Sequence, residues 1–351
     1  MFLPIDHAAQ RSDLPRHCTF APEDWRILAR FWHPVAFAHE IQSTPVPARL
    51  LDVDLVIWRT DAGVHVARDL CPHRGTRLSA GRVDQDQLIC PMHGLHFDGE
   101  GRCSKIPSNP EQTARVSPRL RLQSLQVEDR YGIIWTCLAD TPIWPLPDWP
   151  GIRDAALKRV YVPPNTWAAA ASRHVENFND VAHFPWVHTQ TFGGSEEDRI
   201  PPYDVRETDY GLTFDLGYDE GFNRFPDDVP GDTRHVLYTY ELTYPFSTLI
   251  IIRPNDSWYV QYFADTVCPV SAHETRIFQV ATDTTGDPDA EFLIRESRMI
   301  NDEDKPLVEN QHPEDLPLGI MDEVHIPADR MSVAYRRGLV DKFGLGAPLS
   351  S

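Results

Sequence analysis

The sequence lacks several features that mark whole classes of protein. Its 351 residues contain no apolar run near the 18 residues that a membrane-spanning helix needs. The first residues, MFLPIDHAAQRSDLPRH, lack the basic start and apolar core of a secretory signal peptide, so an intracellular, cytoplasmic location is the default expectation. Basic residues are few, 33 against 52 acidic ones. The resulting formal charge of −19 argues against binding to nucleic acid or to an anionic membrane.

Nucleotide-binding glycine loops and paired cysteines are also missing. The stretch Gly99-Glu100-Gly101 is too short to count as a dinucleotide fingerprint, so we expect no flavin or nicotinamide site in this chain. Only six cysteines are present. Four of them are scattered without paired spacing, which in an intracellular protein favours buried thiols over disulfides: Cys18, Cys103, Cys137 and Cys268.

The other two cysteines each precede a histidine closely. The chain reads Cys71-x-His73, then sixteen residues, then Cys90-x-x-His93. Four mixed cysteine and histidine ligands can form a structural zinc site. The same pattern is that of a Rieske [2Fe–2S] centre, in which two cysteines hold one iron and two histidines hold the other. We favour the iron–sulfur cluster, with zinc as the alternative.

A second candidate metal site lies about ninety residues further on. His183 and His188 are five residues apart, which does not place them on one face of an ideal helix, but Pro185 between them would bend or end the helix and let them converge. Two histidines and a carboxylate form the facial triad of non-haem Fe(II) sites. Alone, this spacing is more typical of an ordinary histidine pair. Its position downstream of the cysteine–histidine pattern favours a metal site.

The third ligand is expected from an acidic segment, residues 301–311, which reads NDEDKPLVENQ. Asp302, Glu303 and Asp304 all lie in it. For Asp302 and Glu303 we expect a solvated helix face.

Both patterns, with their order and separation, resemble the oxygenase (alpha) component of Rieske non-haem iron oxygenases. Residues 176–188 (ENFNDVAHFPWVH) and 303–311 (EDKPLVENQ) are most similar to the homo-oligomeric branch of caffeine N-demethylases and dicamba and vanillate O-demethylases. Two usual aromatic residues of the cluster loops are replaced, by Met92 and Leu95. These changes alter the shielding of the cluster and leave its four ligands intact.

The resemblance implies an α+β fold, with an N-terminal all-β Rieske [2Fe–2S] domain followed by a helix-grip catalytic domain built on an antiparallel sheet. Strand-like segments followed by helical ones agree with α+β for the second domain. A cluster of four prolines between residues 142 and 150 places the junction near residue 145. We therefore expect an arm at 1–25, a Rieske domain at 26–145 and a catalytic domain at 146–351. Helices are expected over 166–183, 288–310 and 332–342.

The resemblance also assigns roles to single residues. It makes Asp304 the carboxylate ligand of a mononuclear Fe(II) held with His183 and His188. It makes Asp180 a bridge between His93 of one subunit and His183 of the next, in a head-to-tail homotrimer. Asn177 is a catalytic candidate that would hydrogen-bond near the iron, although a place on the helix surface is an equal alternative.

The activity implied is that of the terminal oxygenase of a multicomponent monooxygenase. It would use O2 to hydroxylate, or to N- or O-demethylate, a small aromatic or heterocyclic compound, as in the breakdown of aromatic hydrocarbons. Electrons would come from NAD(P)H through a separate ferredoxin/flavin reductase. One alternative is a dioxygenase that forms cis-diols. The other is a Rieske electron carrier whose second site is only structural.

Several remaining residues carry weaker expectations. Phe184, Trp186 and the apolar residues 246–252 could line a pocket, but core packing is the preferred interpretation. Three histidines outside the two patterns are expected to be ordinary polar residues: His96, His174 and His235.

Overall fold

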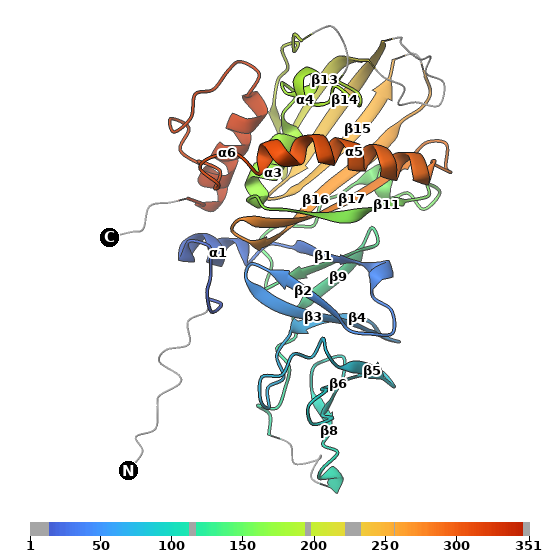
Figure 1. The fold of residues 1–351 in the computed structure, drawn as a ribbon, viewed down its shortest axis with the longest axis vertical. Coiled ribbons are helices and arrows are strands. Elements are labelled where there is room, and N and C mark those ends of the chain that lie inside the picture. Colours follow the sequence, from blue (N-terminus) through green and yellow to red (C-terminus); the bar gives the residue numbers. More distant parts are fainter. Residues whose placement is uncertain (1–13, 112–116, 194–197, 222–232, 256, 347–351) are drawn as a thin grey trace.

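The computed structural model describes residues 14–111, 117–193, 198–221, 233–255 and 257–346. Three small antiparallel sheets form the N-terminal part, and one large antiparallel sheet with helices forms the C-terminal part (Figure 1). This is the α+β arrangement that the sequence predicts. No helix among the described residues is long and apolar enough to span a lipid bilayer.

Two of the small sheets build the base of the N-terminal part. The first has the strand order β1–β10–β9 and the second the order β2–β3–β4. Their strands are β1 (His33–Phe37), β2 (Val46–Leu50), β3 (Val53–Thr60), β4 (Gly63–Arg68), β9 (Gln126–Arg130) and β10 (Ile133–Cys137). The hairpin expected after residue 51 is therefore present as β3 and β4.

Strand β3 explains why its sequence is almost wholly apolar. Successive side chains of a strand point to opposite faces. Leu55 and Ile57 belong to the main hydrophobic core, whereas Val56 and Trp58 belong to a second core beneath the cluster loops. Because both faces are buried, the strand shows no alternation of apolar and polar residues.

The third small sheet lies at the foot of Figure 1 and consists of short strands. These are β5 (Arg82–Asp84), β6 (Gln87–Ile89), β7 (His96–Phe97) and β8 (Cys103–Lys105). The second cysteine–histidine pattern occupies the connection between β6 and β7. The predicted turn after Phe97 is present, closed by a hydrogen bond from the Gly101 amide to the Asp98 carbonyl (2.9 Å).

The C-terminal sheet has seven antiparallel strands in the order β11–β17–β16–β15–β14–β13–β12. They are β11 (Val160–Trp167), β12 (Arg206–Glu207), β13 (Gly211–Glu220), β14 (Arg234–Thr243), β15 (Ser247–Pro254), β16 (Gln261–Ser271) and β17 (Glu274–Asp283). The helical elements of the chain are α1 (Pro22–Leu28), η1 (Ala38–Glu40), α2 (Pro150–Arg153), α3 (Ala171–Asn179), α4 (Phe184–Val187), α5 (Ala290–Val308) and α6 (Arg330–Phe343).

Helix α5 crosses one face of the large sheet (Figure 1). Asp289 caps its start, since its carboxylate accepts a hydrogen bond from the Phe292 amide (3.0 Å). Its buried residues recur every three or four positions, which gives one face toward the sheet: Leu293, Ser297, Asn301, Asp304 and Val308. The helices expected over 288–310 and 332–342 correspond to α5 and α6.

The helix expected over 166–183 is wrong at both ends. Residues 166 and 167 complete β11, and α3 ends at Asn179 because the Asp180 backbone is extended (φ −80°, ψ 142°). Pro185 does not bend a continuous helix. It lies in the first turn of α4, where a proline is favoured because its missing N–H leaves no hydrogen bond unmade.

The two parts of the chain are in direct contact. The backbone amides of Leu51 and Asp52 donate hydrogen bonds to the carbonyls of Pro269 (2.7 Å) and Val270 (3.0 Å). We place the boundary between the parts in the proline-rich segment near residue 145, between β10 and α2. Helix α1 begins at Pro22, so the folded chain starts within the segment expected to be an arm; residues 1–13 lie outside the described residues.

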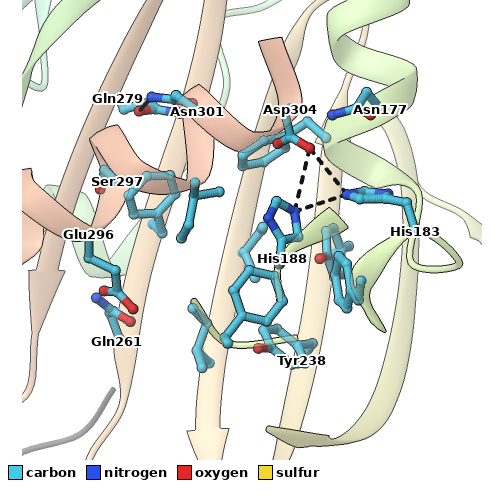
Figure 2. A pocket seen from close by; sticks show the side chains of 18 of the residues that line it. Asn177, His183, His188, Tyr238, Gln261, Gln279, Glu296, Ser297, Asn301 and Asp304 are labelled. Atoms are coloured by element: carbon cyan, nitrogen blue, oxygen red, sulfur yellow. Dashed lines mark hydrogen bonds and ion pairs between the residues drawn. The ribbon is translucent and has the colours of Figure 1, made fainter. Parts of the chain in front are cut away.

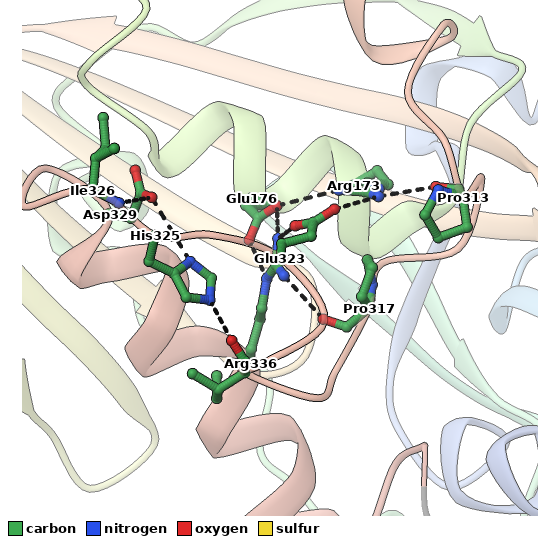
Figure 3. Close-up of polar contacts among 10 residues, drawn as sticks. Arg173, Glu176, Pro313, Pro317, Glu323, His325, Ile326, Asp329 and Arg336 are labelled. Carbon is green, nitrogen blue, oxygen red and sulfur yellow. Dashed lines mark hydrogen bonds and ion pairs between the residues drawn. The ribbon is translucent and has the colours of Figure 1, made fainter.

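A buried ion network ties α3 to α6 and to the segment between α5 and α6 (Figure 3). The Arg336 guanidinium donates to both carboxylate oxygens of Glu176 (2.6 and 2.8 Å) and to Glu323 (2.6 Å). Arg173 donates to Glu323 as well (3.2 Å). Both arginines are 3% exposed, so these carboxylates, together with the carbonyls of Pro313 (2.9 Å from Arg173) and Pro317 (3.0 Å from Arg336), replace the water that the guanidinium groups lose.

We predict that Arg336→Leu lowers the free energy of unfolding by about 3–5 kcal/mol, because it leaves the largely buried Glu176 carboxylate with only the more distant Arg173 (3.7 Å) and removes a partner of Glu323. The shift in the midpoint of urea unfolding, followed by circular dichroism, measures this. Lys342→Ala is the matched control on the same helix. Lys342 pairs with a Glu207 side chain that is 72% exposed, and such a pair contributes little. Equal midpoints for the two variants would contradict the role given to the network.

Candidate active site

The two cysteine–histidine loops close in the same way. In the first loop the Cys71 amide donates to the Thr76 carbonyl (2.8 Å), and the Gly75 amide donates back to the Cys71 carbonyl (2.8 Å). In the second loop the Gly94 amide donates to the Cys90 carbonyl (3.0 Å). Gly75 and Gly94 have φ of 73° and 64°, a conformation that glycine adopts without strain. Two similar hairpin-like loops therefore present two similar ligand pairs.

The loops separate their sulfur ligands from their nitrogen ligands. Cys71 and Cys90 are 2% and 1% exposed, whereas His73 and His93 lie at the surface with ring centroids 4.6 Å apart. Burial raises the pKa of the Cys71 thiol to about 11, so ionisation there requires a positively charged partner such as iron. Two thiols inside and two imidazoles outside fit the asymmetric ligand set of a Rieske cluster.

The second site brings together three side chains from two separate segments (Figure 2). His183 and His188 flank α4, and Asp304 projects from α5. Their ligand atoms all lie within 4.8 Å of one another. The two Nε2 atoms are 3.1 Å apart, and Oδ1 of Asp304 is 3.5 Å from each of them.

Each imidazole is fixed through its other nitrogen. Nδ1 of His183 donates to Asp180 (2.9 Å), and Nδ1 of His188 donates to Glu303 (2.9 Å). A carboxylate only accepts, so both rings carry a proton on Nδ1 and turn an Nε2 lone pair toward the centre. Oδ1 of Asp304 is buried and has no hydrogen-bond partner among the described residues. Three acceptors thus face one another without a donor, and this fits a divalent cation.

The electrostatics of the group agree with a cation site. Burial raises the pKa of Asp304, although the charge of His183 and a hydrogen bond from Asn177 act against it. Desolvation would lower the pKa of His183, but the hydrogen bond to Asp180 and the nearby Asp304 outweigh it and raise this pKa. Asp180 and Asp304 therefore favour a positive charge between them. A bound metal ion would supply that charge while His183 keeps a single proton, on Nδ1.

Glu303 corrects the sequence analysis, which expected it on a solvated helix face. Its side chain is 13% exposed and accepts hydrogen bonds from His188, from the Thr191 hydroxyl (2.7 Å) and from the Gln190 amide (3.0 Å). Its neighbour Asp302 is exposed, as expected. The local sequence could not distinguish the two acids, because the partners of Glu303 lie more than a hundred residues earlier in the chain.

His174 is a second correction. It was expected to be an ordinary polar residue, but it is 1% exposed, its Nε2 lies 2.9 Å from the Asp265 carboxylate, and it lines the cavity beside the triad. His235 pairs with Asp219 at the surface, in line with expectation. The sequence offered one signal for this position: His174 lies one helical turn before Asn177 and therefore on the same face of α3.

The triad forms one end of a cavity between α5 and the large sheet (Figure 2). The cavity holds about 710 Å³ of empty space, counting the part open to solvent. Its wall is mostly apolar and includes Phe184, Ile250 and Ile252. Trp186, by contrast, is 70% exposed, so the expectation of core packing is wrong for it. Asn177 also lines the cavity and bonds to Asp304, rather than lying free on the helix surface.

Known proteins share both parts of this chain. Residues 31–126 match the model of the Rieske [2Fe–2S] domain, and residues 167–341 match that of the vanillate O-demethylase oxygenase C-terminal domain. The chain is 30% identical over 327 residues to methylxanthine N1-demethylase of Pseudomonas putida, covering 90% of both proteins. It is 30% identical over 330 residues to the methylxanthine N3-demethylase of the same species, covering 90% of this chain and 89% of that protein.

Solved structures agree. The Pseudomonas putida N1-demethylase with caffeine superposes with a TM-score of 0.78 at 27% identity, covering 90% of this chain and 91% of that one. Dicamba monooxygenase bound to 3,6-dichlorosalicylic acid superposes with a TM-score of 0.76 at 21% identity, covering 90% and 97%, and shares the fold. The chain therefore belongs to the Rieske non-haem iron oxygenases, as the oxygenase component of a multicomponent monooxygenase in the branch of N- and O-demethylases.

Proposed function

We propose that this oxygenase removes an N- or O-methyl group from, or hydroxylates, a small ring compound at a mononuclear Fe(II) held by His183, His188 and Asp304. The observation that carries the proposal is the convergence of three acceptors, two of them oriented from behind by acids, at the end of an apolar cavity. Cys71, His73, Cys90 and His93 would hold the [2Fe–2S] cluster.

Fe(II), when bound, supplies the centre at which O2 reacts with the substrate and with electrons delivered by the cluster. The protein's own part is to position the metal ligands and to shield the site from bulk water. Asn177 bonds to Asp304, whose Oδ1 has no hydrogen-bond partner, so we assign the contact to the other oxygen. With that oxygen engaged, Oδ1 of Asp304 would be the atom that holds the metal together with His183 and His188.

The net reaction follows from the family and from the apolar wall. A ring compound with a methyl group, O2, two electrons and two protons give the hydroxymethyl compound and water. A hydroxymethyl group on nitrogen or oxygen then breaks down to the demethylated compound and formaldehyde. Exclusion of bulk water by the aromatic and aliphatic wall limits the wasteful reduction of O2 when no substrate is present.

The electrons must come from outside the chain. We propose a separate ferredoxin/flavin reductase that uses NAD(P)H, supported by the lack of a dinucleotide-binding glycine pattern. Within one chain, the small sheet β5–β8, which carries the second cysteine–histidine loop, lies well apart from helices α4 and α5, which bring the triad together (Figure 1). The reduced cluster of one copy would therefore serve the iron of another.

The surface around Asp180 supports a head-to-tail homotrimer. Asp180 lies in a hollow beside the ion network of Figure 3, together with His325 and Asp329. Val324, which lines the same hollow, is an apolar side chain that is 95% exposed. Exposed apolar residues also flank the cluster loops, namely Leu70 (55%) and Met92 (57%). Docking these surfaces would bring His93 of the partner subunit to Asp180.

Screening is the direct test of the activity. N-methyl and O-methyl ring compounds, supplied with NADH and a reductase, should give formaldehyde in proportion to the O2 consumed. Diol products without formaldehyde would favour the dioxygenase alternative, and absence of O2 consumption with every compound would favour the electron carrier. Cys71→Ala should abolish the visible absorbance of the cluster and the activity, whereas Cys103→Ala should retain both. A colourless, zinc-loaded wild-type protein would overturn the cluster assignment.

Glu303→Gln should weaken Fe(II) binding by about 10- to 100-fold, because it removes the charge that orients and polarises His188. Titration of the iron-free protein against a competing chelator measures the affinity. Asp302→Asn, one residue away at the surface, is the control and should bind iron as the wild type does. The supporting role of Glu303 is wrong if both variants have wild-type affinity.

Asp180→Asn, supplied with Fe(II) in excess, should hold both metals and lose turnover, because its amide oxygen can accept from one imidazole but no longer from a second. Iron and sulfide analysis checks the metals, and stopped-flow oxidation of the pre-reduced cluster with substrate and O2 checks electron transfer. Asp209→Asn, at an exposed position, should oxidise its cluster at the normal rate. Normal cluster oxidation in the Asp180 variant would refute the bridge.

A further inference from the structure

The cavity has a second polar end. Gln261 and Glu296 lie together away from the triad (Figure 2). Gln261 opens β16, and Glu296 lies two turns of α5 before Asp304. Eight residues of helix separate the two ends by about 12 Å along the axis. A compound of one or two rings can therefore reach both ends at once.

Gln261 is an unusual residue for this wall. It is 2% exposed, and its Oε1 has no hydrogen-bond partner among the described residues. Buried polar atoms in proteins are almost always bonded, so an amide oxygen left unpaired in a cavity wall calls for an explanation. A bound molecule with a donor group would supply the missing hydrogen bond.

The neighbouring acid decides which end of the amide faces the cavity. Glu296 can only accept, so the Gln261 amide is best oriented with its NH2 group toward the carboxylate and its oxygen toward the ligand. A carboxylate accepts up to four hydrogen bonds, so Glu296 has capacity for a ligand beside any other contact that it makes. This end of the cavity therefore offers acceptors and negative charge.

Several other polar side chains of the wall are bonded to protein partners. Gln279 and Asn301 hydrogen-bond to each other through their side-chain amides (3.2 and 2.9 Å), and His174 is bonded to Asp265. Between the two ends the wall is largely apolar, with Phe263 and Ile300 among its residues. Ser297, next to Glu296 on α5, also lines the cavity, so Gln261, Glu296 and Ser297 make up the polar surface at this end.

We propose that Gln261 and Glu296 select a neutral or cationic ring compound that carries an N–H donor, and that they hold its methyl group toward the triad. Ring compounds whose polar group is a carboxylate are disfavoured, because they offer no donor to Gln261 and bring a second negative charge to Glu296. This inference rests on the proposed function, since it assigns the orientation of a substrate in that same cavity.

Three probes of similar shape distinguish the effects of an N–H donor, of a group that only accepts hydrogen bonds and of a negative charge on the ligand. 4-Methoxybenzamide is neutral and has an N–H donor, 4-methoxyacetophenone is neutral without one, and 4-methoxybenzoate is an anion. Isothermal titration of the anaerobic holoenzyme gives the dissociation constant of each without turnover. We expect the benzamide to bind at least about tenfold more tightly than the acetophenone, and the benzoate to bind most weakly.

Variants then assign the preference to the two side chains. Gln261→Leu should remove the advantage of the benzamide over the acetophenone, and Gln261→Glu should keep it and reject the benzoate further. Glu296→Gln should improve binding of the benzoate about tenfold or more. Glu291→Gln, on the exposed face of the same helix, should change no affinity. The visible spectrum and the iron content establish that each variant is folded.

The proposal is overturned if none of the probes binds, if wild-type enzyme binds the acetophenone or the benzoate as tightly as the benzamide, or if the Gln261 and Glu296 variants keep the wild-type order. Formaldehyde assays distinguish this from failure of the proposed function. Formaldehyde from probes without a preference for the benzamide would leave the oxygenase activity standing. If the benzamide binds as expected but no methylated ring compound causes O2 consumption, the proposed ligand selection stands and the proposed oxygenase function is wrong.

Discussion

The structure depends on one electrostatic arrangement, in which two imidazoles face each other across 3.1 Å with acids behind them. Two nitrogen lone pairs and a buried carboxylate oxygen repel one another unless positive charge lies between them. Asp180 and Glu303 hold the rings in this unfavourable geometry through their Nδ1 protons. The three ligand atoms are therefore held in an arrangement that suits a cation, on elements that include the buried face of α5.

The same geometry joins the elements that deliver it. Helix α3 ends at Asn179, the extended Asp180 turns the chain, and Pro185 starts α4, so that the two histidines sit at its two ends. The ion network of Arg173 and Arg336 holds α3 and α6 together next to this turn. The triad thus has rigid support on one side and an apolar cavity on the other.

Local spacing predicted the cluster loops because all four ligands lie within 23 residues of sequence and each loop is self-contained. The convergence of His183 and His188 was predicted for a partly wrong reason, since the break lies at Asp180 rather than at Pro185. Glu303 and His174 were missed because their partners, near residues 188 and 265, are brought to them only by the tertiary fold. Gln261 gave no signal, since a lone glutamine at the start of a strand has no distinctive pattern.

Helix α5 lines the cavity with Glu296, Ser297 and Ile300 and brings Asp304 to the two histidines. A helix fixes the spacing of its side chains, because each residue lies about 1.5 Å further along the axis and is rotated by about 100° around it. Side chains along its first half can be exchanged to accept new molecules while the distance to the iron stays constant. An inserted residue, in contrast, would rotate Glu296, Ser297 and Ile300 by about 100° relative to Asp304. New specificities in such a scaffold therefore arise by substitution and not by a change of helix length.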